Sequence, residues 1–263
     1  METKKAELAA AQKQTPLEEL KRQCAAATEV RNFFAAVTRP PRGWVNIIAE
    51  VKKASPSAGV IKPDFDPIAR AELYHTAGVE ALSVLTDEKY FQGRLEHLAQ
   101  IRAAVPLPLL RKDFIIDPYQ VWEARAAGAD AILLIAEILT DSALMDLLIL
   151  AAELRLTALI EVHEMDALLR VRSMLGFPLR SYSLLGINNR NLNDFTVDLG
   201  TTLRLADWVE DRTILVAESG IKNATDVRRL AAAGVRSILV GETLMRSADP
   251  RGTITELKGL AQR

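Results

Sequence analysis

Short apolar segments recur along this chain, and each stops at a polar or charged residue or at a glycine. Six of them, each given with the residues that follow, are 45–49 before Glu50 and Lys52, 108–110 before Lys112, 156–160 before Glu161, 184–187 before Asn188 and Arg190, 213–217 before Glu218, and 237–240 before Gly241. Such short apolar runs are typical of strands buried on both faces, as in a parallel sheet covered by helices. Because parallel folds keep their chemistry at the carboxyl ends of the strands, the pattern indicates an enzyme.

From residue 44 to the end of the chain, strand-like and helix-like segments alternate. Eight strands are expected near 44–51, 79–85, 107–112, 130–135, 156–161, 183–188, 213–218 and 236–240. Helices are expected near 66–77, 94–104, 118–127, 141–153, 164–174, 201–208, 223–233 and 250–261. A weak internal repeat supports this count, because Ala-Gly precedes a buried strand at 77–82, 127–132 and 233–238. We predict a single-domain α/β fold, a (β/α)8 TIM barrel.

An open, doubly wound sheet is the structural alternative to a closed barrel. The sequence offers neither the Gly-x-Gly-x-x-Gly pattern nor the P-loop that often accompanies such sheets. It also carries no signal for an antiparallel hairpin. These features favour the barrel, and about 250 residues is a common length for one.

Residues 1–43 differ from the rest of the chain and are expected to form an N-terminal helical extension that packs on a barrel of residues 44–263. Helices are predicted at 1–14 and 16–27, the second with Thr15 as its N-cap and Pro16 at its first position. The Pro- and Gly-containing segment 39–43 ends the extension.

Composition narrows the class of protein. The net charge is −1, which gives no reason to expect binding to nucleic acid or to an anionic membrane surface. No apolar stretch approaches the ~20 residues that span a bilayer, and the first residues do not resemble a signal peptide. The single cysteine, Cys24, excludes an intramolecular disulfide and suits a reducing cytosol. We therefore expect a cytoplasmic protein.

Five charged residues at strand ends are the candidates for catalysis. Side chains alternate along a strand, so Glu50 and Lys52 share a face. If the barrel closes, Lys112, Glu161 and Glu218 converge with them on one mouth, where unlike charges can divide acid and base roles. The alternative is that these are ordinary strand-end charges that reach solvent or pair with one another.

A second group of residues suits a phosphate. Ser219 and Gly220 follow the seventh strand and Gly241 follows the eighth, which are the loops where such barrels commonly bind phosphate through backbone N–H groups. Arg190 and Lys52 could add positive charge. Glu242 argues against a phosphate unless only its amide is used, and the glycines could also serve simply as turns.

The remaining candidates carry weaker signals. His75, His97 and His163 show no ligand spacing, so we expect ordinary surface or packing histidines and no metal. Phe91 and Phe114 lie just beyond strand ends, where they could cap the core or form an apolar slot for a ring.

Six motifs in the predicted order resemble those of the indole-3-glycerol-phosphate synthase family. They are EVKKASPS at 50–57, LSVLTDEKYFQG at 82–93, LRKDFIID at 110–117, LIEVH at 159–163, GINNRNL at 186–192 and VAESGI at 216–221. The resemblance covers roughly residues 15–260. It implies a barrel enzyme of tryptophan biosynthesis, a carboxy-lyase without a cofactor. The implied reaction converts 1-(2-carboxyphenylamino)-1-deoxyribulose 5-phosphate to indole-3-glycerol phosphate, carbon dioxide and water.

The resemblance also implies roles for individual residues. Lys112 would be the general acid for ring closure, a role that a lysine with a depressed pKa can serve, and Glu161 the acid or base for dehydration. Lys52 would hold the substrate carboxylate, with Glu50 tuning its charge. The other implied positions are Asn188 for the hydroxyl chain, Glu218 for the polar wall, Ser55, Arg190, Ser219, Gly220, Gly241 and Glu242 for the phosphate end, and Phe91 and Phe114 beside the aromatic ring.

Two other functions remain open at this point. One is another phosphate-binding barrel enzyme, such as an isomerase or a Schiff-base aldolase with Lys112 as nucleophile. The other is a barrel that binds a sugar phosphate without converting it. In each case the expected partner is a phosphorylated small molecule, with no obligate protein partner evident.

Overall fold

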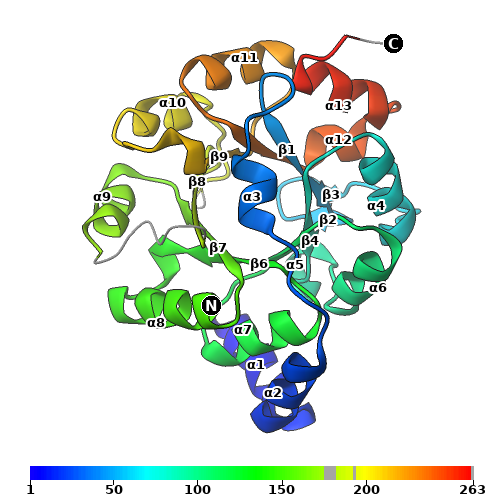
Figure 1. The fold of residues 1–263 in the computed structure, drawn as a ribbon, viewed down its shortest axis with the longest axis vertical. Helices are drawn as coiled ribbons and strands as arrows, with labels where there is room; N and C mark the ends of the chain where they lie inside the picture. The colour runs from blue at the N-terminus through cyan, green and yellow to red at the C-terminus, as the bar shows by residue number, and fades with distance from the viewer. Residues whose placement is uncertain (175–181, 192–193, 262–263) are drawn as a thin grey trace.

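Eight parallel strands close into a barrel in the computed structural model of this chain (Figure 1). In barrel order they are β1 (Asn46–Val51), β10 (Ser237–Val240), β9 (Leu215–Glu218), β8 (Ser183–Asn188), β7 (Thr157–Val162), β6 (Ala131–Ile135), β5 (Leu109–Lys112) and β4 (Ala81–Leu85). The structure describes residues 1–174, 182–191 and 194–261, so the last residue of the 186–192 motif lies outside them. The predicted (β/α)8 fold is confirmed, and the open sheet is excluded.

The barrel strands are buried along almost their whole length. Every residue of the eight strands is buried except Lys112, which is partly exposed at the end of β5. This burial explains why the strands appear in the sequence as continuous apolar runs rather than as alternating patterns.

An outer ring of helices covers the barrel (Figure 1). The helices that follow the barrel strands are α4 (Pro67–Thr76), α6 (Glu96–Ala104), α7 (Pro118–Ala126), α8 (Asp141–Glu153), α9 (Met165–Ser173), α10 (Gly200–Ala206), α11 (Ala224–Ala232) and α13 (Pro250–Lys258). Three of them begin with an aspartate N-cap followed by proline, at Asp66, Asp117 and Asp249. In the described ranges, no helix has the length and apolar character needed to cross a membrane.

Several short elements were not expected from the sequence. They are α5 (Glu88–Phe91), α12 (Glu242–Arg246), the 3-10 helices η1 (Ala136–Ile138) and η2 (Arg212–Ile214), and the strands β2 (Ala54–Ser55) and β3 (Gly59–Val60). β2 and β3 pair antiparallel, a short hairpin for which the sequence carried no signal. Strands of two residues are too short to show alternation, and Gly59, with φ 63°, permits the turn.

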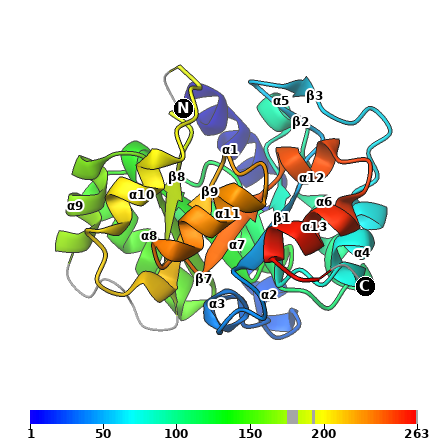
Figure 2. The ribbon, with the colours of Figure 1, turned by 90° about the horizontal axis from the view of Figure 1, so that it is seen from above.

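Residues of the predicted extension form three helices, α1 (Glu2–Gln14), α2 (Leu17–Ala26) and α3 (Phe33–Thr38), of which α3 was not expected. Figure 2 shows α1 on the side of the barrel where β2, β3 and α5 lie, and α2 and α3 on the opposite side. Thr15 is not an N-cap, because Pro16 takes that position. The Thr15 carbonyl instead accepts a 2.8 Å hydrogen bond from the Tyr119 hydroxyl, which ties the helix junction to α7.

Polar contacts fasten the segment around α3 to the amino-terminal end of the barrel. The guanidinium group of Arg31 donates to three backbone carbonyls, those of Arg102, Val105 and Leu107. The Asp130 carboxylate accepts from the backbone N–H of Arg31 at 2.7 Å, from Arg102 at 2.8 Å and from the Leu109 N–H at 2.9 Å. Asp130 is fully buried, so these donors satisfy a charge that water does not reach.

Replacing Asp130 with alanine is expected to destabilise the fold by about 3 kcal/mol, because Arg102 and two backbone N–H groups lose a buried acceptor. Urea unfolding monitored by circular dichroism measures the change. Asp146→Ala, at an exposed position on α8, is the matched control and should change the free energy of unfolding by less than about 0.5 kcal/mol. Equal stability of Asp130→Ala and this control would contradict the fastening role.

Candidate active site

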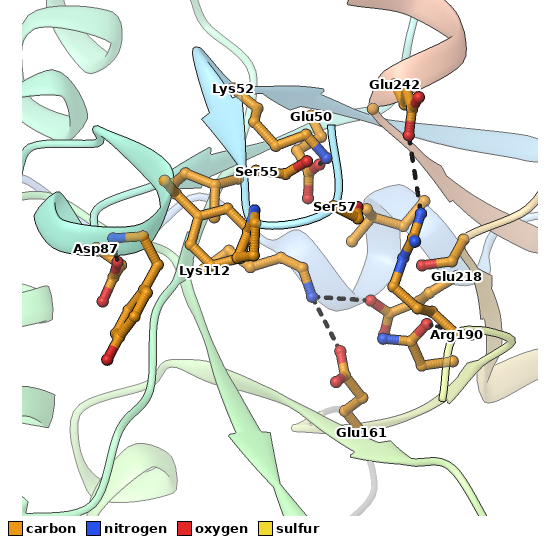
Figure 3. Close-up of a pocket in the computed structure, with 18 of the residues that line it drawn as sticks. Glu50, Lys52, Ser55, Ser57, Asp87, Lys112, Glu161, Arg190, Glu218 and Glu242 are labelled. Atoms are coloured by element: carbon orange, nitrogen blue, oxygen red, sulfur yellow. Dashed lines mark hydrogen bonds and ion pairs between the residues drawn. The ribbon is translucent and has the colours of Figure 1, made fainter. Parts of the chain in front are cut away.

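A cavity of about 1020 Å³ lies at the carboxyl ends of the barrel strands. All of the site residues predicted from the sequence line it: Glu50, Lys52, Ser55, Phe91, Lys112, Phe114, Glu161, Asn188, Arg190, Glu218, Ser219, Gly220, Gly241 and Glu242. Figure 3 labels ten of the lining residues, whose side chains come from strand ends, from loops and, for Glu242, from the start of α12. The structure therefore brings together predicted site residues that are up to 192 positions apart in the chain, from Glu50 to Glu242.

Lys112 lies at the centre of this cavity between two glutamates. Its Nζ is 2.9 Å from the Oε2 of Glu161 and 3.0 Å from the Oε2 of Glu218 (Figure 3). The side chains are 15%, 2% and 1% exposed for Lys112, Glu161 and Glu218, respectively. One ammonium group thus bridges two carboxyl groups in a place that water barely reaches.

Burial and the neighbouring charges move the pKa values of these three groups apart. Burial alone would lower the pKa of Lys112, but the carboxylates of Glu161 and Glu218 outweigh it and raise the pKa above its usual range. Burial alone would raise the pKa of Glu161, but Lys112 and His163 outweigh it and lower the pKa. Burial raises the pKa of Glu218 to about 8, against the opposing effect of Lys112.

At neutral pH, the three groups therefore hold different charges. Lys112 is an ammonium and Glu161 is a carboxylate, while the raised pKa of Glu218 favours the protonated form of its carboxyl group. The pKa of Lys112 is raised rather than depressed, because two carboxyl groups face its ammonium group. Neighbouring titratable groups with separated pKa values are the arrangement from which acid and base roles are assigned.

Glycines make room for two of the buried carboxyl groups. A Cβ at Gly186 of β8 would overlap the Oε1 of Glu218, and a Cβ at Gly241 would overlap the carboxylate of Glu50. The Oε1 of Glu218 finds no hydrogen-bond partner among the described residues, consistent with its raised pKa. Gly241 was expected to serve a phosphate through its amide, and the structure adds this second reason for a glycine.

The predicted pair at the end of β1 is present. The Nζ of Lys52 is 2.5 Å from the Oε1 of Glu50, and both side chains are largely buried. Ser55 ends β2, directly before the turn to β3, and its Oγ accepts the Ala58 N–H at 3.2 Å. On another wall of the cavity, the rings of Phe91 and Phe114 are 6.4 Å apart between centroids.

The loops after β8 and β9 hold each other in position. Asn189, which the sequence analysis did not single out, donates from Nδ2 to the carbonyls of Glu218 and Ser219 at 3.0 and 3.1 Å. Its Oδ1 accepts from the backbone and the hydroxyl of Thr202. Ser219 and Gly220 have φ values of 63° and 75°, so Asn189 supports a left-handed turn that is unfavourable for a serine.

Arg190 and Glu242 face each other across the predicted phosphate end. The guanidinium of Arg190 is 3.7 Å from the Oε2 of Glu242, whose Oε1 pairs with Arg246 at 3.0 Å (Figure 3). The backbone N–H of Arg190 donates to the Oδ1 of Asn188 at 3.0 Å. The Glu242 side chain therefore contacts the arginines, and its charge lies close to the place where a phosphate was expected.

A second charged network connects α1 to the cavity, and the sequence analysis missed it. Lys4 lines the cavity, and its Nζ is 3.0 Å from Asp87 and 2.8 Å from Asp113. Both aspartates lie in recognised motifs, at 82–93 and 110–117, but nothing in the sequence paired them with a lysine more than 80 residues away.

The expectation that all three histidines are ordinary surface or packing residues does not hold for His163. Its Nε2 is 3.3 Å from the Oε1 of Glu161, and its Nδ1 is 3.2 Å from the Oε2 of Glu137. Its position two residues after Glu161 could have indicated a shared face. Among the residues that the structure describes, no group of three or more histidine, cysteine or acidic side chains could hold a metal ion.

Comparisons with solved structures agree with the barrel. The chain superposes on 3-hexulose-6-phosphate synthase from Salmonella typhimurium with a TM-score of 0.59 and 14% identity, covering 81% of this chain and 97% of that one. It superposes on phosphoribosylanthranilate isomerase from Thermotoga maritima with a TM-score of 0.54 and 16% identity, covering 82% and 100%. At these identities the likeness concerns the fold alone.

Sequence comparisons are more specific. The family profile described as indole-3-glycerol phosphate synthase matches residues 1–257. A protein of that name from Chlorobium chlorochromatii is 46% identical over 257 residues, covering 97% of this chain and 96% of its own length. Another from Acidithiobacillus ferrooxidans is 49% identical over 255 residues, covering 97% and 95%. The chain belongs to the indole-3-glycerol phosphate synthase family, as its six motifs predicted.

Proposed function

We propose that this chain forms indole-3-glycerol phosphate from 1-(2-carboxyphenylamino)-1-deoxyribulose 5-phosphate, and that the reaction takes place in the cavity around Lys112. The observation that carries the proposal is the ammonium of Lys112 held between Glu161 and Glu218. The family resemblance supplies the substrate. In support, the ammonium of Lys112 can act as an acid, and the carboxyl groups of Glu161 and Glu218 each lie within hydrogen-bond distance of it.

Ring closure needs a proton at the ketone oxygen. The ring carbon that bears the carboxylate attacks the ketone carbon, a carbon–carbon bond forms, and the electron pair of the C=O bond moves to oxygen. We assign Lys112 as the donor to that oxygen. Its raised pKa does not prevent the transfer, because the oxygen becomes a strongly basic alkoxide as the bond forms.

Two further steps complete the indole. The carboxylate leaves as carbon dioxide, and its electron pair restores the aromatic ring. The hydroxyl then leaves as water with a proton, and a neighbouring carbon loses a proton to a base. We assign Glu161 as that base, since its lowered pKa keeps it ionised, and Lys52 as the proton source for the departing hydroxyl. One proton is taken up overall, because an anionic carboxylate departs as a neutral molecule.

The two anionic ends of the substrate require separate positive groups. We propose that Lys52, beside Glu50, also contacts the substrate carboxylate, and that Arg190 and the amides of the loops at Ser219, Gly220 and Gly241 bind the phosphate. Because the Oδ1 of Asn188 already accepts the Arg190 N–H, the NH2 group of Asn188 is the part that can donate to a substrate hydroxyl. The rings of Phe91 and Phe114 would flank the aromatic ring.

The sequence supports a cytoplasmic location and a phosphorylated small-molecule substrate, with no obligate protein partner. The location, the class of substrate and the lack of an obligate partner are parts of the proposal. The boundary between an extension of residues 1–43 and a barrel of residues 44–263 also stays a prediction.

Indole fluorescence tests the proposed function directly. Purified protein with the carboxyphenylamino substrate should produce indole-3-glycerol phosphate, and Lys112→Met should lower kcat by roughly 1,000-fold with KM within a few-fold, because the general acid is lost while the phosphate end remains. Lys53→Met is the matched control, since Lys53 follows Lys52 but does not line the cavity. Full activity of Lys112→Met would refute the assignment of the acid, and an inactive wild-type protein would refute the function.

Glu161→Gln should slow dehydration more than ring closure, because it removes the base and keeps the shape of the side chain. In rapid-quench experiments we expect a decarboxylated but still hydroxylated intermediate to accumulate, with a fall in kcat of about 100-fold or more. Glu153→Gln, at an exposed position of α8, is the control. Equal rates and no intermediate in Glu161→Gln would assign the base elsewhere.

Arg190 and Glu242 should affect substrate affinity in opposite directions. Arg190→Gln removes the positive charge from the phosphate end and should raise KM by about 10-fold or more. Glu242→Gln removes the negative charge 3.7 Å from that arginine and should lower KM. The pair of variants is measured with the phosphorylated substrate at constant ionic strength. A change of KM in the same direction for both would contradict the proposed phosphate position.

A further inference from the structure

His163 lies between two carboxylates that come from neighbouring strand ends. Its Nε2 faces the Oε1 of Glu161 at 3.3 Å, and its Nδ1 faces the Oε2 of Glu137 at 3.2 Å. The imidazole is 6% exposed and Glu161 is 2% exposed, while Glu137 reaches solvent at 27%. The other oxygen of Glu161, Oε2, contacts Lys112. Glu161 is thus held from both sides by nitrogen groups.

The backbone fixes this arrangement. Glu161 belongs to β7 and His163 follows two residues later, so both side chains point to the same face at the strand end. Glu137 lies in η1, directly after the neighbouring strand β6. Its Oε1 accepts the backbone N–H of His163 at 2.6 Å, while its Oε2 faces the ring. Glu137 therefore contacts His163 at two points, which sets the orientation of the imidazole.

We propose that His163 is a positioning residue for Glu161: as an imidazolium clamped by Glu137, it keeps the Glu161 carboxylate ionised and oriented toward Lys112. The proposal rests on the proposed function, in which Glu161 is the base for dehydration.

The charges around His163 favour its protonated form. On the cavity side, Lys112 and Glu218 lie beyond Glu161. On the other side is a second cavity, of about 730 Å³, lined in part by Glu164, Asp198 and Arg204. Asp198 and Arg204 pair with each other at 2.9 Å and largely cancel. The carboxylates of Glu137 and Glu161 are therefore the charges that dominate at the ring.

The resulting protonation has a definite pH range. Burial alone would lower the pKa of His163, but the carboxylates of Glu137 and Glu161 outweigh it and raise the pKa to about 10. The two contacts are ion pairs at 3.2 and 3.3 Å, and neither ring nitrogen makes a well-aligned hydrogen bond to the described residues. A raised pKa means that the stabilising contribution is fully present below the unfolded value near 6.5 and is lost as the pH rises toward 10. Across the neutral range, His163 thus carries a positive charge.

This charge has a consequence for catalysis. A cation beside Glu161 lowers the pH at which the carboxylate takes up a proton, so the base stays available in mildly acidic solution. Without the charge on His163, Lys112 would be left to favour the ionised form of Glu161. The acidic limb of the kcat profile would then move to higher pH.

The test compares His163→Gln with wild type in full kcat and KM profiles against pH. Glutamine keeps the bulk and an N–H donor but carries no charge. We expect the acidic limb of kcat to move up by about one pH unit, with kcat about 10-fold lower on that limb and KM within about 2-fold. Glu137→Gln should move the limb in the same direction by less. His75→Gln, an exposed histidine on α4, should superpose on wild type. An unshifted limb in His163→Gln would overturn the proposal.

A second measurement does not depend on activity. The chain has three histidines, so NMR titration of histidine-labelled protein, assigned with His163→Gln and His75→Gln, follows each imidazole separately. We expect the His163 ring to remain protonated through pH 8 in wild type and to titrate at lower pH in Glu137→Gln. Titration of His163 near 6.5 would refute the proposal that Glu137 and Glu161 keep its ring protonated. If the protein proved inactive while the His163 pKa was well above 6.5, the proposed function would fail and the proposal for His163 would remain.

Discussion

The ammonium of Lys112, held between Glu161 and Glu218, is the interaction on which the site depends. Removing charged groups from water costs several kcal/mol for each ion, and that cost is offset only when partners are placed within hydrogen-bond distance. Here β5, β7 and β9 provide the partners, and the closed barrel fixes the separation of these three strands. The surrounding features follow from this constraint. Gly186 admits the Glu218 carboxyl group, and His163 supports the far side of Glu161.

The sequence predicted the fold because its strongest signals were local. Apolar runs, helix caps and Ala-Gly repeats each depend on neighbouring residues, and together they defined the eight strands. The convergence of charges such as Glu50 and Glu218 then followed from one rule about parallel barrels, that strand carboxyl ends share a mouth. Only the resemblance of the motifs to a known family supplied the substrate, since no spacing of charges specifies a carboxyphenylamino sugar phosphate.

What the sequence could not predict depended on distance in three dimensions. The upward shift of the Lys112 pKa arises because two carboxyl groups outweigh the effect of burial. Neither the burial nor these neighbours can be recognised in a linear motif. Lys4 meets Asp113 only because α1 lies beside the cavity mouth. Asn189 looked like one more polar residue after a strand, yet it joins the loops after β8 and β9. Contacts between elements far apart in sequence leave no periodic signal.

Gly186 and Gly241 matter to the site because they lack a Cβ atom. A methyl group at either position would overlap a carboxyl oxygen. The positions of the Glu218 and Glu50 carboxyl groups therefore depend on a glycine in the neighbouring backbone. Neither glycine has a side chain with which to touch a substrate. In mutational surveys these positions would nevertheless resemble reactive residues in their intolerance. Any attempt to adapt this barrel to new chemistry must therefore keep glycine at these two positions as well as the charged residues.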